Sequence, residues 1–330
     1  MKKLSTLILI TFFSFGCSNS MENSMNPFFT DYDAPYQIPP FDEIKEEHYM
    51  PAFDKGMKEQ LEEIDQIANN PEQATFENTL VELERTGKTL SKVADVFFNL
   101  LSSNTNKQMD KIAAEISPKL SAHRDAISLN KKLYERVNAV YEQRNALGLT
   151  TEQMRLVEET HKGFIRSGVQ LDTSSMEKLT QINQELSSLS VQFDQNLLKE
   201  TNEGYSLLID DENQLDGLPE DFRDQAANLA EENGHNGKWM FKPTRVSMYP
   251  FLTYSTQRDL REKLYTSYIK RGDNDNDRDN KNLAIEMADL RLERANLLGY
   301  KTHADFVLEN TMAKNTGRAV SYTHLRAHET

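Results

Sequence analysis

The sequence predicts a mainly α-helical fold with minor short strands. Glycine and proline are scarce, at 13 and 10 of 330 residues, which is too few for a β-sandwich rich in turns. Apolar residues recur at every third or fourth position over long stretches, which is the spacing of one face of an α-helix. Because only two short segments indicate strands, the β structure is expected to be minor.

Composition and charge exclude several classes of protein. The chain carries 52 acidic residues against 38 Lys and Arg, a net charge of −14, which argues against a nucleic-acid partner held on a basic face. Hydrophobic residues make up 38% of the chain, which suits amphipathic helices but not a multispan membrane protein. The single cysteine, Cys17, excludes an intramolecular disulfide and a cysteine-ligated metal.

Residues 1–16 have the layout of a lipoprotein signal peptide. Two lysines precede the apolar run from Leu4 to Phe15, and Gly16 precedes Cys17. The run is too short to span a membrane and has the form of a secretory signal. Cys17 stands where a bacterial lipoprotein carries its acylated residue, so we expect a lipid anchor there. An ordinary signal peptide with an incidental cysteine is the alternative.

This leader implies a location for the protein. We expect it at the bacterial cell envelope, on the outer membrane or a periplasmic face, with the lipid anchor as its only contact with a membrane. Residues 17–25 are small and polar and form the expected tether.

The first part of the body combines an arm with helices. Residues 26–40 are rich in proline and aromatic residues and predict an extended arm lying on the protein. A helix is predicted over residues 49–68, where an Asn-Asn-Pro sequence ends it. Apolar residues between Phe76 and Leu101 keep helical spacing and predict one continuous face over about seven turns.

The second part predicts further helices and two strands. Thr150 with Gln153 forms a capping box ahead of one helix, and Ser174 with Glu177 forms another. Gly299 is placed to end the last predicted helix. The predicted segments are helices over 107–144, 255–270 and 280–298, helices following the two capping boxes, strands over 205–209 and 238–242, and a turn at 216–219.

The acidic run from Asp273 to Asp279 partly resembles a calcium-binding loop. Counted from Asp275, carboxylates fall at positions 1, 3 and 5, and Glu286 falls at position 12. Position 6, however, is Asn280 instead of glycine, and the next helix begins inside the supposed loop. We therefore interpret the run as the acidic start of a helix, where the dipole favours carboxylates.

The histidines do not form a zinc-binding motif. His324 and His328 are four residues apart, but Glu329 lies outside the pair instead of between them. His328-Glu329 could open a His-Glu-x-x-His motif, yet no second histidine follows. Nucleophile, Walker and dinucleotide-binding signatures are also missing from the sequence. We therefore predict no catalytic and no metal-ligating residue in this chain.

Several short segments share the order and spacing of one known family. They are Asn26–Phe29, Pro39–Phe41, His48–Phe53, Thr75–Leu80, Arg258–Tyr265, Leu290–Tyr300, Ala304-Asp305 and Met312-Ala313. Together these segments resemble the thimet oligopeptidase (oligopeptidase A) family of zinc metallopeptidases from residue 26 to about residue 316. The arm and the leader are most similar to the bacterial dipeptidyl carboxypeptidase branch of this family.

The resemblance implies the N-terminal helical lobe of a two-lobed zinc peptidase with a deep channel. In that family one zinc is held by His-Glu-x-x-His and a downstream Glu, and the first Glu is the general base for metal-bound water. The implied activity is that of a peptidyl-dipeptidase, which releases dipeptides from the C-terminus of short peptides. None of these ligand positions maps onto this chain. We therefore expect the catalytic zinc domain to be absent, the chain to bind no zinc and to be inactive alone, and the missing C-terminal lobe to be its partner.

Two alternatives to this function stay open. One is an endo-acting oligopeptidase of the same family, because the implied carboxylate-binding groups lie elsewhere. The other is a helical peptide-binding lipoprotein without enzymatic activity.

The last residues depart from the pattern of the family. The segment from Val320 to Thr330 loses the helical periodicity and resembles translated adapter read-through at the end of a gene fragment. We therefore expect residues 317–330 to be a non-native tail and residues 26–316 to form the helical region.

Overall fold

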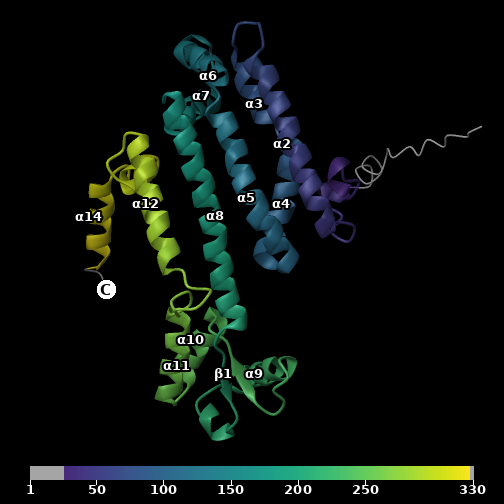
Figure 1. Cartoon of the computed structure of the whole chain (residues 1–330), viewed down its shortest axis with the longest axis vertical. Coiled ribbons are helices and arrows are strands. Elements are labelled where there is room, and N and C mark those ends of the chain that lie inside the picture. Colours follow the sequence, from purple (N-terminus) through teal and green to yellow (C-terminus); the bar gives the residue numbers. More distant parts are fainter. Residues whose placement is uncertain (1–25, 328–330) are drawn as a thin grey trace, which may run out of the picture. The chain divides into compact units, whose positions relative to one another are not determined.

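The computed structural model describes residues 26–327, and they are mainly helical (Figure 1). The predicted fold class is therefore confirmed. The chain divides into two compact units, residues 1–112 and residues 113–330, which are described separately below. Within the described range, no helix combines the length and apolar character needed to cross a membrane. The predicted signal peptide, the tether and Cys17 lie outside the described residues.

The first unit is built on two packed helices, α2 (Glu46–Ala68) and α4 (Lys88–Ser103). Between them lie the π-helical segment η3 (Phe76–Val81) and the short helix α3 (Glu82–Arg85). The prediction of one continuous helical face here is wrong. The helices are interrupted at Thr86 and Gly87, where Gly87 adopts a positive φ of 76° that favours glycine.

The arm that precedes α2 is only partly extended. It contains two 3₁₀ turns, η1 (Pro27–Phe29) and η2 (Pro35–Gln37). Phe28 in η1 is buried, and its ring lies 5.6 Å from that of Tyr49 in α2. Tyr49 in turn contacts Phe97 of α4 at 5.0 Å, so the start of the arm belongs to the aromatic core of this unit.

Helix α5 (Lys107–Ser128) begins in the last residues of the first unit and lies mostly in the second. The helices α6 (Lys131–Gln143), α7 (Thr151–Arg166) and α8 (Thr173–Glu203) follow, with the 3₁₀ turn η4 (Arg144–Ala146) ahead of α7. The predicted helical stretch over 107–144 is confirmed, but it consists of two helices. It is broken before α6, where the Asn130 side chain accepts a hydrogen bond from the Leu133 amide at 3.1 Å and starts a new helix.

The two predicted capping boxes have different outcomes. The first is confirmed, because the Thr150 amide donates to the Gln153 side chain at 3.0 Å and the Gln153 amide donates to the Thr150 hydroxyl at 3.3 Å. The second is wrong, because α8 is capped by Asp172, which accepts from the Ser175 amide at 3.0 Å. Because α8 already begins after Asp172, Ser174 lies inside its first turn and cannot be the N-cap residue.

Beyond α8, a small αβ substructure surrounds one apolar cluster. Strands β1 (Leu207–Ile209) and β2 (Trp239–Phe241) pair antiparallel, with Leu207 opposite Phe241. Both strands fall within the predicted segments. The surrounding helices are η5 (Glu212–Leu215), α9 (Glu220–Glu232), α10 (Arg245–Tyr254) and α11 (Arg258–Ile269). The buried cluster includes Leu215, Phe241, Phe251 and Leu264.

The chain then returns along α8. Helix α12 (Lys281–Leu297) packs beside α8 (Figure 1) through Ile182, Leu186 and Leu189 of α8 and Met287 of α12. The short helix α13 (His303–Glu309) follows. As predicted, Gly299 ends α12, with a φ of 83°.

The final described segment is also helical. Residues of the expected non-native tail form most of helix α14 (Thr316–Ala327), in which no residue is buried. The expected loss of helical periodicity after Val320 therefore does not prevent a helix. The Asn315 side chain accepts from the Arg318 amide at 3.0 Å, so local capping supports the helix without burial of an apolar face.

Candidate functional site

Two of the described histidines, His161 and His48, make contacts within the helical framework. His161 stacks on Tyr141 with ring centroids 3.8 Å apart, and its Nε2 lies 2.9 Å from Asn138 Oδ1. His48 accepts a hydrogen bond from the Lys45 amide at the start of α2. His324 is exposed on α14, and His328 lies outside the described residues.

A zinc ion does not fit the side chains that the structure describes. Over residues 26–327, no group of three or more His, Cys, Asp or Glu side chains could hold a metal ion.

The acidic run before α12 surrounds a lysine. The Nζ atom of Lys281 lies 2.7 Å from Asp273, 2.8 Å from Asp275 and 2.8 Å from Asp279. Hydrogen bonds from Lys281 lower the pKa of Asp279 to about 2. The second Asp279 oxygen accepts from the Lys281 amide at 2.9 Å. The run lies ahead of α12, whose first turn holds no acidic residue. The interpretation as the acidic start of a helix therefore holds only for Asp279, which accepts from the first helical amide, and the ammonium group of Lys281 lies among the carboxylates.

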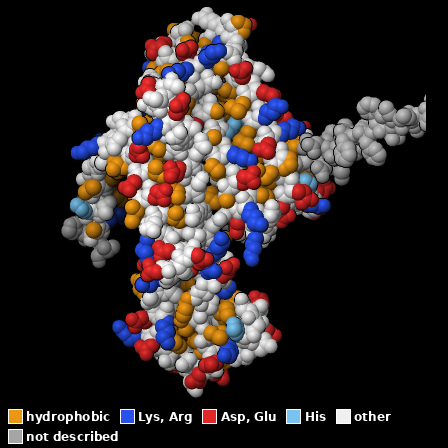
Figure 2. All heavy atoms as spheres, viewed as in Figure 1, with side chains coloured by type: hydrophobic (Ala, Val, Ile, Leu, Met, Phe, Trp, Pro, Cys, Tyr) orange, Lys and Arg blue, Asp and Glu red, His pale blue; other side chains and the backbone are white. Residues whose placement is uncertain are grey.

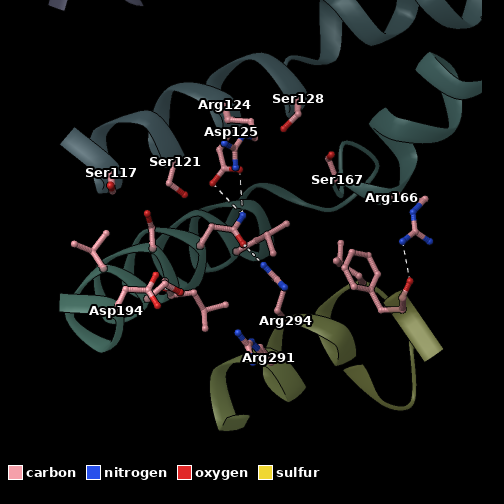
Figure 3. Close-up of a pocket in the computed structure, with 18 residues that line it drawn as sticks. Ser117, Ser121, Arg124, Asp125, Ser128, Arg166, Ser167, Asp194, Arg291 and Arg294 are labelled. Carbon is pink, nitrogen blue, oxygen red and sulfur yellow. Dashed lines mark hydrogen bonds between the residues drawn. The ribbon is translucent and has the colours of Figure 1, made fainter. Parts of the chain in front are cut away.

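A pocket of about 490 Å³ lies in the second unit between α5, α8 and α12. Its wall is polar: arginines and serines dominate, and two aspartates are present (Figure 3). Arginines 291 and 294 come from α12 and face Arg124 and Asp125 of α5. The polar lining residues are Ser117, Ser121, Arg124, Asp125, Ser128, Arg166, Ser167, Asn183, Ser187, Ser190, Asp194, Arg291 and Arg294.

A hydrogen-bonded chain crosses the centre of this pocket. The Asn183 amide nitrogen lies 3.1 Å from both carboxylate oxygens of Asp125. Arg294 Nη1 donates to the Asn183 carbonyl oxygen at 3.3 Å. Three helices, α5, α8 and α12, are therefore joined by three polar side chains (Figure 3).

Burial perturbs both charged ends of this chain. Asp125 is buried, which raises its pKa, while the hydrogen bond from Asn183 and the nearby arginines act in the opposite direction. Burial also lowers the pKa of Arg294, and the like charge of Arg291 adds to this effect. The Nε atom of Arg294 is buried and has no hydrogen-bond partner within the described structure.

One end of the pocket is closed by Arg166 and Phe306. Arg166 forms an ion pair with Glu309 and donates to the Phe306 carbonyl oxygen at 2.7 Å. Its guanidinium also lies 4.6 Å from the centre of the Phe306 ring, within cation–π range. The charge of Arg166 is thus already matched by a carboxylate.

Sequence reasoning missed this pocket completely. Asp125, Asn183 and Arg294 belong to no local motif, because 58 residues separate Asp125 from Asn183 and 111 residues separate Asn183 from Arg294.

On the face of the molecule shown in Figure 2, acidic and basic side chains are interspersed.

Comparison with known proteins places the chain among the peptidases. The model of peptidase family M3 matches residues 251–326, a range that includes most of α14. The chain is 34% identical over 299 residues to the dipeptidyl carboxypeptidase of Escherichia coli (strain K12), which is 91% of this chain and 44% of that protein. The chain belongs to peptidase family M3. The family resemblance of the sequence is thereby confirmed.

Other members of the family are also similar. The dipeptidyl carboxypeptidase of Salmonella typhimurium is 35% identical over 91% of this chain, and the oligopeptidase A of Haemophilus influenzae is 30% identical over 86%. They are matched over 44% and 42% of their own lengths. The chain thus spans less than half the length of these curated relatives.

Proposed function

We propose that this chain forms the helical part of a zinc-dependent peptidyl-dipeptidase, which releases dipeptides from the C-terminus of short peptides. The observation that carries the proposal is the identity of 34–35% over 91% of the chain to two dipeptidyl carboxypeptidases. The identity to oligopeptidase A is 30% and covers less of the chain.

We also propose that the chain alone does not hydrolyse peptides. Its described residues hold no group able to bind a metal, whereas the family resemblance implies zinc as the agent that activates water. The zinc ligands and the general base would then belong to a C-terminal lobe that this chain does not include. The role of the helical part is to bound the channel and to admit short peptides by size.

An endo-acting oligopeptidase is the second candidate function. It is supported by the similarity to oligopeptidase A of Haemophilus influenzae, which spans 86% of the chain. The two candidates differ in whether a free C-terminal carboxylate is required two residues from the cleaved bond.

Peptide hydrolysis followed by mass spectrometry tests these proposals. Residues 17–330 and the product of the complete reading frame that contains them are each incubated with an N-acetylated hexapeptide, either as the free acid or as the C-terminal amide. We expect the complete product to release a dipeptide from the free acid only, to lose activity with a chelator and to regain it with zinc. We expect no cleavage by residues 17–330.

The outcomes separate the candidates. Equal cleavage of the acid and the amide would favour the endo-acting oligopeptidase. No cleavage by the complete product would contradict a peptidase function. Chelator-sensitive cleavage by residues 17–330 would show that the chain alone is active.

We further propose that the protein is lipid-anchored in the cell envelope through Cys17. The support is the order of charged, apolar and small residues ahead of this cysteine. Metabolic labelling with an alkyne fatty acid should mark the wild-type protein and not the Cys17→Ser variant. Equal labelling of both would refute the anchor.

A further inference from the structure

We propose that the pocket between α5, α8 and α12 binds a small anionic molecule through its phosphoryl or carboxylate groups. This inference goes beyond the proposed peptidase function, because it concerns the binding of an anion in a cavity that lies within the second unit. It rests on the charge, the free donors and the size of the pocket.

The charge of the pocket is opposite to that of the chain. Four arginines and two aspartates line it, whereas the whole chain has a net charge of −14. Two positively charged side chains repel each other when they lie close together. Arg291 and Arg294 nevertheless share one wall of the pocket, and their proximity disfavours the charged form of Arg294.

Carboxylates neutralise this charge only in part, because Arg166 alone of the four arginines forms an ion pair in the described structure. Glu309 is engaged by Arg166 at the edge of the pocket, and Asp125 accepts two hydrogen bonds from Asn183. Within the described structure, neither Arg124 nor Arg291 forms an ion pair, so both guanidinium groups keep free donors. A bound anion is the partner that these donors lack.

The deepest donor points to the same conclusion. In the described structure Arg294 donates from Nη1 to the Asn183 carbonyl oxygen, and its buried Nε atom has no hydrogen-bond partner. A buried donor without a partner costs free energy. A carboxylate, which is planar at carbon, or a phosphoryl group, which is tetrahedral at phosphorus, presents two oxygens that accept paired hydrogen bonds from one guanidinium group.

Size and lining define the class of ligand. A volume of about 490 Å³ falls within the usual range of small-molecule pockets and exceeds the need of one inorganic ion. Serine hydroxyls from α5 and α8, among them Ser121 and Ser187, add donors around the arginines. The ligand is therefore an organic or condensed anion with more than one charged group.

Titration calorimetry on residues 17–330 tests this site with two probes, sodium pyrophosphate and sodium citrate, in sodium chloride of equal ionic strength. We expect saturable binding of at least one probe with a stoichiometry of one. Binding of pyrophosphate alone identifies a phosphoryl ligand, and binding of citrate alone identifies a carboxylate ligand. Both results support the oxyanion site.

Two pocket variants and one control make the test specific. Arg291→Gln changes an exposed side chain, so the fold should be kept, and Arg294→Gln removes the deeper donor. Each should weaken binding about tenfold or more, because a charge-assisted hydrogen bond is lost. Arg155→Gln serves as the matched control, since Arg155 is an exposed arginine of α7 outside the pocket, and it should bind like the wild type.

Three outcomes would overturn the proposal. The first is saturable binding of neither probe, and the second is an equal loss of affinity in Arg155→Gln and Arg291→Gln. The third is binding by residues 17–330 that disappears in the product of the complete reading frame, because another part of that protein would then cover the pocket. Loss of peptidase activity in that product would leave these binding results unchanged, so the two proposals fail independently.

Discussion

Arg166, the last residue of α7, forms an ion pair with Glu309, the last residue of α13, although 143 residues separate them in the sequence. The dipole at a helix C-terminus disfavours a carboxylate, and Arg166 supplies the compensating charge. The Tyr300 hydroxyl donates to Glu309 at 2.5 Å and accepts from Arg166 at 3.2 Å. This cluster holds α13 against α7 and closes one end of the arginine pocket.

Loss of Arg166 should loosen α13. Arg166→Ala leaves Glu309 and the Phe306 carbonyl without their charged donor, so we expect a decrease of about 2 kcal/mol in the free energy of unfolding. Urea unfolding followed by circular dichroism measures it. The control is Arg155→Ala, whose exposed pairing with Glu159 lies within one helix and should contribute less than about 0.5 kcal/mol. Equal losses in both variants would contradict the role given to Arg166.

Two helical glycines should respond in opposite directions to alanine. A Cβ atom on Gly56 of α2 would lie 2.7 Å from the Leu90 backbone nitrogen in α4, whereas one on Gly163 of α7 would meet nothing within 4 Å. Gly56→Ala should therefore destabilise the protein by about 1–3 kcal/mol through overpacking. Gly163→Ala should stabilise it by about 0.5–1 kcal/mol, because alanine is the better helix former. Thermal unfolding of both variants checks this, and a shift of the same sign in both would refute the packing argument.

The contacts of Asp279 with Lys281 should make stability depend on pH in acid. The folded-state pKa of Asp279 is about 2, below its ordinary value of 3.8. Its contribution to stability is therefore present above pH 4 and is lost as the pH falls toward 2. We expect Asp279→Asn to be less stable than the wild type at pH 5, with a difference that shrinks between pH 4 and 2. Urea midpoints over this range measure the difference, and a constant gap would contradict the pKa shift.

His161 should make the protein less stable in mild acid. Burial lowers its pKa below the ordinary 6.5, with a smaller effect of the nearby Arg144 in the same direction and of Glu142 in the opposite one. As the pH falls, His161 therefore binds a proton at a higher pH in the unfolded chain than in the folded one. The free energy of unfolding decreases as the pH drops below about 6.5. His161→Phe keeps an aromatic ring beside Tyr141 and removes the titrating group.

The measurement is the slope of unfolding free energy against pH between 7 and 5. We expect a shallower slope in His161→Phe than in the wild type. His235→Phe, at an exposed position of the loop before β2, is the control for introducing a phenylalanine. A slope unchanged in His161→Phe, or reduced equally in His235→Phe, would show that His161 is not responsible.

Much of the fold follows from signals between near neighbours in the sequence. The capping box of Thr150 and Gln153, the positive φ of Gly299 and the apolar spacing along α8 each involve residues within a few positions, and each is present in the structure. The errors lie where two helices meet. Periodicity alone continues through Gly87 and Asn130, but the chain changes direction there because one adopts a left-handed conformation and the other caps a new helix.

The sequence by itself therefore determined the helical class, several helix boundaries and the family resemblance, because these depend on local hydrogen bonding and on the order of residues along the chain. The arginine pocket was decided only by tertiary structure. Asp125, Asn183 and Arg294 lie on three different helices, and no local motif distinguishes any of them. Packing of α8 against α12, and the meeting of α5 with both at the pocket, brings these side chains within hydrogen-bond distance. Burial then changes the pKa values of Asp125 and Arg294.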